Sequence, residues 1–434
     1  MHRDDEQLAL RQLYKYLGSS WFSRAWAFQE VVLPLRSGIL IGISAIPLEG
    51  LYWICGMIDW IEREGVLPPP VGPDDITLSS RGRRIVPIMQ RTWKSLHLPE
   101  DPQSVPYHSI TQLLSSISPN MQTSVPQDRI YAFLGLNLDP RIVIEPNYRD
   151  SELEVQVCTA KAIVQGSNRL DIFECLCRAG DRDQDWPFSR RRPTWAPEFT
   201  REEHLSSFSI SEALSRQPQG GSNMYPRIGK CDSKTLTVHG RRIDRIRSRI
   251  DPMERTYFDF SHYVTSAVQG CEPSQRQVPR PTAQTVLAAI LAQGHCDNGL
   301  VARCFSKTEL LGGILMSVVR LYLDRIETKS GVNKEVVTFQ CWEELQEVIS
   351  SLYHVAYKHY LSVTDEGRMA LGCTLEPGDE IWVLHGCTKP VALRPANEGT
   401  YCVQETCFLE GWMDPWGAGM VDWGEEDGVE LKLV

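Results

Sequence analysis

The stretch that opens at Trp21 constrains the fold most, because two tryptophans and two phenylalanines stand within eight residues. At about 3.6 residues per turn, Phe22, Trp26 and Gln29 fall along one stripe of a helix. Pro34 lacks a backbone N–H and is expected to end that helix. Since so large an apolar area has to be buried, we expect Trp21, Phe22 and Trp26 to anchor a core, with polar side-chain tips at its edge.

The composition excludes several classes of protein. The chain has 434 residues, of which 42% are hydrophobic, so it can bury a sizeable core and is expected to form two or three domains. Its formal net charge of −10 argues against a nucleic-acid binder, because neutralising phosphates requires an excess of basic residues. The most apolar stretch, residues 37–48, is too short to span a bilayer, and the charged residues 1–6 lead into no secretory signal.

The cysteines indicate a reduced protein without a metal centre. Thirteen of them are scattered without a C-x-x-C pair, which predicts free thiols and a cytoplasmic location. Cys175 and Cys177 lack a second dyad at metal-ligand spacing, and His354 and His359 fall on different faces of a helix. We therefore expect buried structural thiols and no metal.

The pattern before residue 150 predicts an α/β domain. Residues 38–43 form a candidate buried strand between two helices, which is an α/β order. Residues 68–84 contain several prolines and are expected to form a loop. Helices are expected over residues 8–17, 47–64, 85–96, 109–114 and 128–136.

The rest of the chain divides into a connector, residues 151–233, and an α+β region, residues 234–434. Ser151 and Glu154 form a near-capping box that predicts a helix over residues 153–164. Further helices are expected over residues 282–294, 308–326 and 340–361, and strands over 234–246, 381–384, 391–393, 400–403 and 407–409. Five arginines between residues 241 and 249 form either an anion site or the solvated face of an amphipathic element.

Two blocks of the N-terminal region resemble the fungal heterokaryon incompatibility (HET) domain. Residues 21–33, W-F-S-R-A-W-A-F-Q-E-V-V-L, are similar to the family signature W-F-x-R-x-W-x-x-Q-E-V-x-L. Residues 128–136, D-R-I-Y-A-F-L-G-L, are similar to D-K/R-I-Y-A-L-L-G-L. The family's I-x-P-D-Y follows as I-E-P-N-Y at residues 144–148, with Asn147 in place of the usual Asp.

Two later blocks extend the resemblance. Residues 193–199, P-T-W-A-P-E-F, are similar to P-S-W-V-P-D-W, and residues 377–395 are similar to G-D-x-V-x-V-L-x-G-x-x-x-P-x-V-L-R. The positions that match the family motifs are Trp21, Phe22, Arg24, Trp26, Gln29, Asp128, Arg129, Tyr131, Gly135, Trp195, Gly378, Asp379 and Arg394.

One departure concerns the beginning of the family pattern. The blocks Y-x-x-L-S-Y-x-W-G and I-W-I-D-x-x-C-I-N-Q, with which the family's domain opens, do not occur before Trp21. The resemblance therefore implies that residues 1–150 are the C-terminal part of a HET domain, a partial fold similar to Toll/interleukin-1 receptor (TIR) domains, without its first strands. A truncated gene model, a degenerate paralogue and a separate short form remain open.

Glu30 is the one candidate for chemistry. The chain has no HExxH, P-loop, GxGxxG or GxSxG motif. Some TIR domains, to which HET domains are distantly similar, cleave the nicotinamide bond of NAD with a helical glutamate that follows a tryptophan, and Trp26 and Glu30 stand in that relation. The resemblance thus implies NAD as a candidate substrate, with Arg24 able to contact phosphate. The alternative is that Glu30 is structural, because the strands that would complete a nucleotide cleft are not found.

The resemblance implies a protein of fungal self/non-self recognition that triggers programmed cell death, acting through contacts with other proteins, such as HET-family or incompatibility partners. The alternatives are a TIR-like NAD-cleaving enzyme and an inert remnant.

Overall fold

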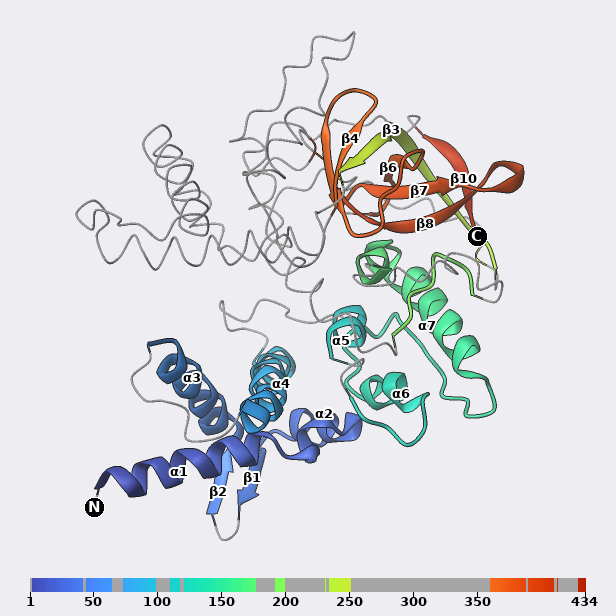
Figure 1. The fold of residues 1–434 in the computed structure, drawn as a ribbon. Helices are drawn as coiled ribbons and strands as arrows, with labels where there is room; N and C mark the ends of the chain where they lie inside the picture. The colour runs from blue at the N-terminus through green and yellow to red at the C-terminus, as the bar shows by residue number, and fades with distance from the viewer. Residues whose placement is uncertain are drawn as a thin grey trace, which may run out of the picture. The chain divides into compact units, whose positions relative to one another are not determined.

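The computed structural model describes residues 2–41, 44–64, 73–98, 110–117, 121–176, 192–199, 231, 234–250, 360–387, 389–409, 412 and 428–434. The chain divides into two compact units (Figure 1). The first comprises Met1–Val155 and Phe199–Glu202, and the second comprises Gln156–Glu198 and Glu203–Val434. The helices expected over residues 282–294 and 308–326, and nearly all of that over 340–361, lie outside the described residues.

The described part of the first unit consists of helices and one antiparallel hairpin. Helix α7, Glu152–Ser167, begins in this unit and continues into the second. The elements wholly within the unit are α1 (His2–Leu17), the 3-10 helix η1 (Ser20–Ser23), α2 (Ala25–Val32), β1 (Gly38–Ile41), β2 (Ser44–Pro47), α3 (Leu48–Glu64), α4 (Pro73–His97), α5 (Ile110–Ser116) and α6 (Asp128–Leu134). The helices expected over residues 47–64, 109–114, 128–136 and 153–164 are confirmed, with small differences at their ends. Those expected over residues 8–17 and 85–96 are also present, but they begin earlier, α1 at His2 and α4 at Pro73.

The core of the first unit is built where α1, α3 and α4 pack together with η1. Its buried side chains are Leu10, Tyr14, Leu17, Phe22, Leu51, Cys55, Ile58 and Val86. The spacing of Leu51, Cys55 and Ile58 places one face of α3 inward, as the sequence predicts. Trp60, on the opposite face of α3, is 51% exposed.

The single helix expected over residues 21–33 is wrong. Arg24 has extended backbone angles, φ −77° and ψ 125°, and separates η1 from α2. The break accompanies a parallel bridge in which the Ala25 N–H donates to the Gln122 carbonyl and the Gln122 N–H donates to the Ser23 carbonyl. This bridge turns α2 relative to η1, so Phe22 and Phe28 are fully buried whereas Trp26 is 39% exposed.

The loop expected over residues 68–84 is also wrong in its second half, because α4 begins at Pro73. Proline suits the first turn of a helix, because the N–H that it lacks would have no partner within the helix there. The helix runs through Pro87 to His97.

The second unit contains an eight-stranded sheet among its described residues, in the order β10-β8-β7-β6-β3-β4-β5-β9. All pairs are antiparallel except β10 with β8. The strands are β3 (Leu236–Ile250), β4 (Tyr360–Thr364), β5 (Met369–Gly372), β6 (Glu380–Leu384), β7 (Val391–Pro395), β8 (Thr400–Thr406), β9 (Phe408–Leu409) and β10 (Val429–Leu433). The strands expected after residue 380, and the one expected near residue 236, are confirmed.

Part of this sheet closes on itself, because β10 pairs with both β8 and β3. The strand β3 is long enough to pair with β6 and β10 through its first part and with β4 through its last part. A second apolar core lies on the sheet and comprises Ile246, Ala370, Leu375, Ile381, Ala392, Cys407 and Leu409. None of the described helices is both long and apolar enough to cross a membrane.

The block at residues 193–199 is tied to this sheet rather than to a separate connector. The Thr194 N–H donates to the Val434 carbonyl over 3.0 Å, and the Thr194 Oγ1 accepts from the Val403 N–H over 2.8 Å. Trp195 is fully buried, and its Nε1–H donates to the Lys234 carbonyl over 3.3 Å. These contacts join the block to residues that follow it by about 40 to 240 positions.

Candidate functional site

Glu30, the candidate catalytic residue, lies on the exposed side of α2. Trp26, one turn earlier, shares that exposure, whereas Ala27, Phe28, Val31 and Val32 are buried. Among the described residues Glu30 has no hydrogen-bond or ion-pair partner. A carboxylate that stabilises developing positive charge works through a preorganised, water-excluding site, which the described surroundings of Glu30 do not provide.

The other motif residues of the first unit hold α2 against α6. The Gln29 Nε2–H donates to the Ala132 carbonyl, and a Cβ on Gly135 would come within 2.5 Å of the Gln29 Oε1. Phe28 and Phe133 pack with their ring centroids 5.4 Å apart. The two sequence blocks are therefore joined across about 100 residues, and the end of the Gln29 side chain lies against Gly135.

A second contact set in this unit fixes the loop after α6. The Tyr131 hydroxyl donates to the Asn147 carbonyl over 3.1 Å and accepts from the Asn147 N–H over 3.0 Å. The Tyr148 hydroxyl donates to Asp128 Oδ1 over 2.8 Å, which raises the pKa of Tyr148. Asn147 stands where the family pattern usually has Asp. The pairing with Tyr131 uses the Asn147 backbone, so it does not depend on the side chain at this position.

The remaining positions in this unit have simpler surroundings. Phe22 is fully buried and packs edge-on against Trp21, with ring centroids 5.1 Å apart. Arg24 is exposed, and its backbone forms the bridge to Gln122. Arg129 is partly buried. Among the described residues, Glu30 forms no ion pair with Arg24 or Arg129.

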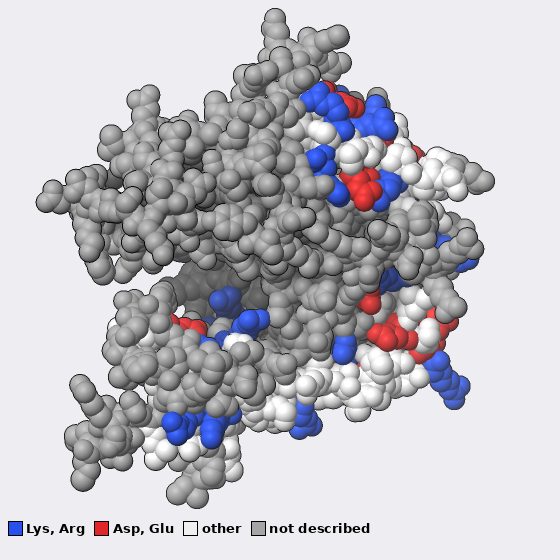
Figure 2. Space-filling view, viewed as in Figure 1, with Lys and Arg blue, Asp and Glu red and all other residues white. Residues whose placement is uncertain are grey.

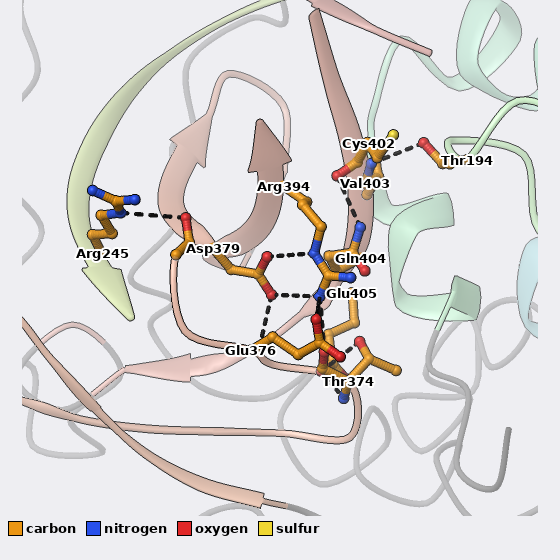
Figure 3. Close-up of polar contacts among 11 residues, drawn as sticks. Thr194, Arg245, Thr374, Glu376, Asp379, Arg394, Cys402, Val403, Gln404 and Glu405 are labelled. Carbon is orange, nitrogen blue, oxygen red and sulfur yellow. Dashed lines mark hydrogen bonds and ion pairs between the residues drawn. The ribbon is translucent and has the colours of Figure 1, made fainter. Parts of the chain in front are cut away.

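The motif residues of the second unit form a buried ion pair, drawn in Figure 3. Asp379 is 1% exposed, and its carboxylate accepts from Arg394 Nε over 2.7 Å and from Arg394 NH2 over 3.0 Å. The Asp379 Oδ2 also accepts from the Glu376 N–H over 2.9 Å. Burial disfavours the guanidinium charge, but the hydrogen bonds and charge of Asp379 outweigh it and raise the pKa of Arg394.

Gly378 makes the turn that places Asp379. Its φ of +100° lies in a region that favours glycine, and Pro377 occupies the preceding turn position, as in a type II turn. The Asp379 N–H donates to the Glu376 carbonyl over 3.0 Å and closes the turn. Gly378 and Asp379 thus form the turn. Arg394, on β7, holds the turn through its ion pair with Asp379.

Glu405, which lies beside this pair, was not singled out from the sequence. It is 1% exposed, and its carboxylate accepts from the Cys373 N–H over 2.8 Å, from the Thr374 N–H over 2.6 Å and from Thr374 Oγ1 over 3.0 Å (Figure 3). Burial raises the pKa of Glu405, although these donors partly oppose the rise. Glu405 stands between Gln404 and Thr406 in β8, so the local sequence gives no signal that it is buried.

The arginines of β3 lie on the solvated surface. Arg241, Arg245 and Arg247 are exposed, and Arg242 pairs with Glu380 over 2.9 Å. Figure 2 shows Lys and Arg atoms interspersed with Asp and Glu atoms over this part of the second unit. The arrangement favours the solvated face over the anion site. No group of three or more potential metal ligands occurs among the residues that the structure describes.

The exposed face of α3 is a further feature that sequence reasoning missed. Trp53 is 67% exposed, Met57 is 45% exposed and Trp60 is 51% exposed. Their spacing of four and three residues is visible in the sequence. When a helix has apolar residues on both faces, however, the pattern does not predict which face is exposed to solvent.

Comparison with known proteins supports a relationship to the HET family at a distance. The chain is 22% identical over 446 residues to heterokaryon incompatibility protein 6, OR allele, of Neurospora crassa. The similarity covers 92% of this chain and 65% of that relative, so the chain spans less than two thirds of the relative's length. No protein-family profile and no solved structure matches the chain.

Proposed function

We propose that this chain is a cytoplasmic, HET-like protein of fungal self/non-self recognition that acts on cell death through contacts with other proteins. The assignment of residues 1–150 to a partial TIR-like α/β domain is part of this proposal. The distant similarity to an incompatibility protein supports the family assignment, and it extends over both units of the chain.

One observation carries the choice of contacts over catalysis. The motif residues that the structure buries are used internally: Gln29 joins α2 to α6, and Asp379 pairs with Arg394. Glu30, the motif residue with a candidate catalytic role, is exposed on α2 and has no ion-pair partner among the described residues. The motif residues therefore stabilise the two folded units. Such a stabilising role is consistent with a protein that functions through contacts made by its surfaces.

The proposal is tested by expressing the chain in hyphae of strains with different incompatibility backgrounds. Dye uptake by dying compartments is scored after fusion, at matched protein levels. We expect the wild-type chain to raise the dying fraction in at least one pairing and Glu30→Gln to behave as wild type. No effect in any pairing would overturn the proposal, and an effect abolished by Glu30→Gln would favour the enzyme.

A further inference from the structure

The exposed stripe of α3 is an apolar feature that the described contacts of the first unit do not explain. Trp53, Met57 and Trp60 occupy one face over two turns, while Leu51, Cys55 and Ile58 fill the core from the opposite face. The Tyr52 and Trp53 rings meet edge-on, with centroids 5.7 Å apart, which restrains the Trp53 ring. Contiguous exposed aromatic side chains of this kind mark interaction sites more often than surfaces left to water.

Gly56 lies within the same face, and no contact among the described residues requires a glycine there. A Cβ at Gly56 would meet no atom within 4 Å, whereas a Cβ at Gly82 would meet the Leu17 carbonyl oxygen at 2.5 Å. Glycine weakens a helix interior, so its presence is best explained where another backbone approaches closely. At Gly82 that neighbour is α1. At Gly56 the open side faces outward, between Trp53, Met57 and Trp60.

The charge of α3 indicates which kind of partner fits. Its sequence contains Glu49, Asp59, Glu62 and Glu64 against one basic residue, Arg63. Arg83 pairs with Asp59 over 2.8 Å, and Glu49 is exposed. The whole chain carries a formal net charge of −10. Self-association through this face would bring acidic helices together, and an anionic membrane would be repelled, so both occupants are disfavoured.

We propose that the Trp53–Met57–Trp60 face of α3 binds an amphipathic helix of a partner protein whose apolar side is bordered by Lys and Arg. The apolar side packs over Gly56 between the two tryptophans, and the basic borders meet the acidic residues of α3 and the faces of the indole rings. This inference rests on the proposed function, since it names the surface and the chemistry of a protein contact.

The test uses the full chain and a fluorescein-labelled amphipathic helix of Leu and Lys, followed by fluorescence anisotropy. We expect Trp53→Ala/Trp60→Ala and Gly56→Leu to weaken binding by about tenfold or more. Trp26→Ala, which removes a partly exposed tryptophan outside α3, is the matched control and should bind as wild type. Because the substituted α3 positions are exposed, the thermal midpoint of each variant should stay close to wild type.

Three outcomes would overturn the inference. The first is equal binding of the Leu/Lys helix by all variants. The second is equal binding of a matched helix of Leu and Glu, which would remove the charge assignment. The third is a dimer in sedimentation that disappears in Trp53→Ala/Trp60→Ala, which would make a second copy the occupant. If the variants keep the hyphal effect and bind the Leu/Lys helix as wild type does, the inference about this face is overturned and the proposed function stands. If no protein has a hyphal effect but the α3 variants bind the helix more weakly, the proposed function is overturned and the inference about this face stands.

Discussion

At the scale of single residues, the motif positions of the second unit act through one buried charge pair. Asp379 is almost fully buried, and Arg394 satisfies both of its carboxylate oxygens. A buried charge without its partner is costly, because the low-dielectric interior does not replace the lost solvation. The energetic role of Arg394 is therefore to keep the turn at Gly378 folded.

Replacement of Arg394 by Met should lower the free energy of unfolding by about 3 kcal/mol, near the low end for buried pairs because the arginine is partly exposed. Asp379→Asn/Arg394→Met leaves no buried charge unpaired, since Glu376, the other carboxylate paired with Arg394, is 52% exposed, and it should be the more stable of the two variants. Urea unfolding of both proteins measures this. Equal stability of the single and double variants would show that the pair is not coupled.

Glu405 should make the second unit less stable as the pH rises. Burial raises its pKa in the folded state above the value in the unfolded chain, so the folded state binds the proton more tightly. Its contribution is then most favourable below the ordinary carboxyl pKa, and it is lost as the pH rises through the raised value. The stability of wild type relative to Glu405→Gln should fall over that window, and a difference that rises with pH would contradict the assignment.

The cysteines should differ sharply in reactivity. Burial raises the pKa of Cys55 to about 12 and raises that of Cys407 well above its usual value, whereas Cys158 is exposed. Because the thiolate is the nucleophile, native iodoacetamide should label Cys158 first among the cysteines that the structure describes. Peptide mass spectrometry gives the order, and early labelling of Cys55 would contradict its burial.

At the scale of elements, local patterns were predictable and long-range ones were not. Ser151 and Glu154 form the predicted capping box, with the Ser151 N–H donating to Glu154 Oε2 over 2.8 Å. All of its donors and acceptors lie within four residues. The break at Arg24 depends on Gln122, about 100 residues away, so periodicity alone could not show it. The pairing of Asp379 with Arg394 likewise requires the β6–β7 hairpin.

Because of the break at Arg24, Phe28 rather than Trp26 is the buried aromatic residue of α2. Phe28→Ala removes a fully buried ring and should cost about 3–5 kcal/mol. Trp26→Ala removes a ring that is 39% exposed and should cost only about 1 kcal/mol. Thermal or urea unfolding measures the stability of the two variants. A larger loss of stability for Trp26→Ala than for Phe28→Ala would support the continuous helix instead.

At the scale of the whole molecule, two units with separate cores each enclose their own motif residues. The Gln29 contact lies in the first unit, and the Asp379–Arg394 pair lies in the second. The similarity to the Neurospora crassa protein spans 92% of the chain and therefore both units. We therefore place the proposed protein contact at the exposed stripe of α3.

The central claim is that the chain works through contacts and not through turnover of NAD at Glu30. The most direct measurement is nicotinamide release by the purified chain and by Glu30→Gln at equal concentration. An isolated exposed carboxylate lacks the binding and orientation that supply most of a rate, so we expect no release above buffer from either protein. Release by the wild-type chain that disappears in Glu30→Gln would contradict the claim and make Glu30 catalytic.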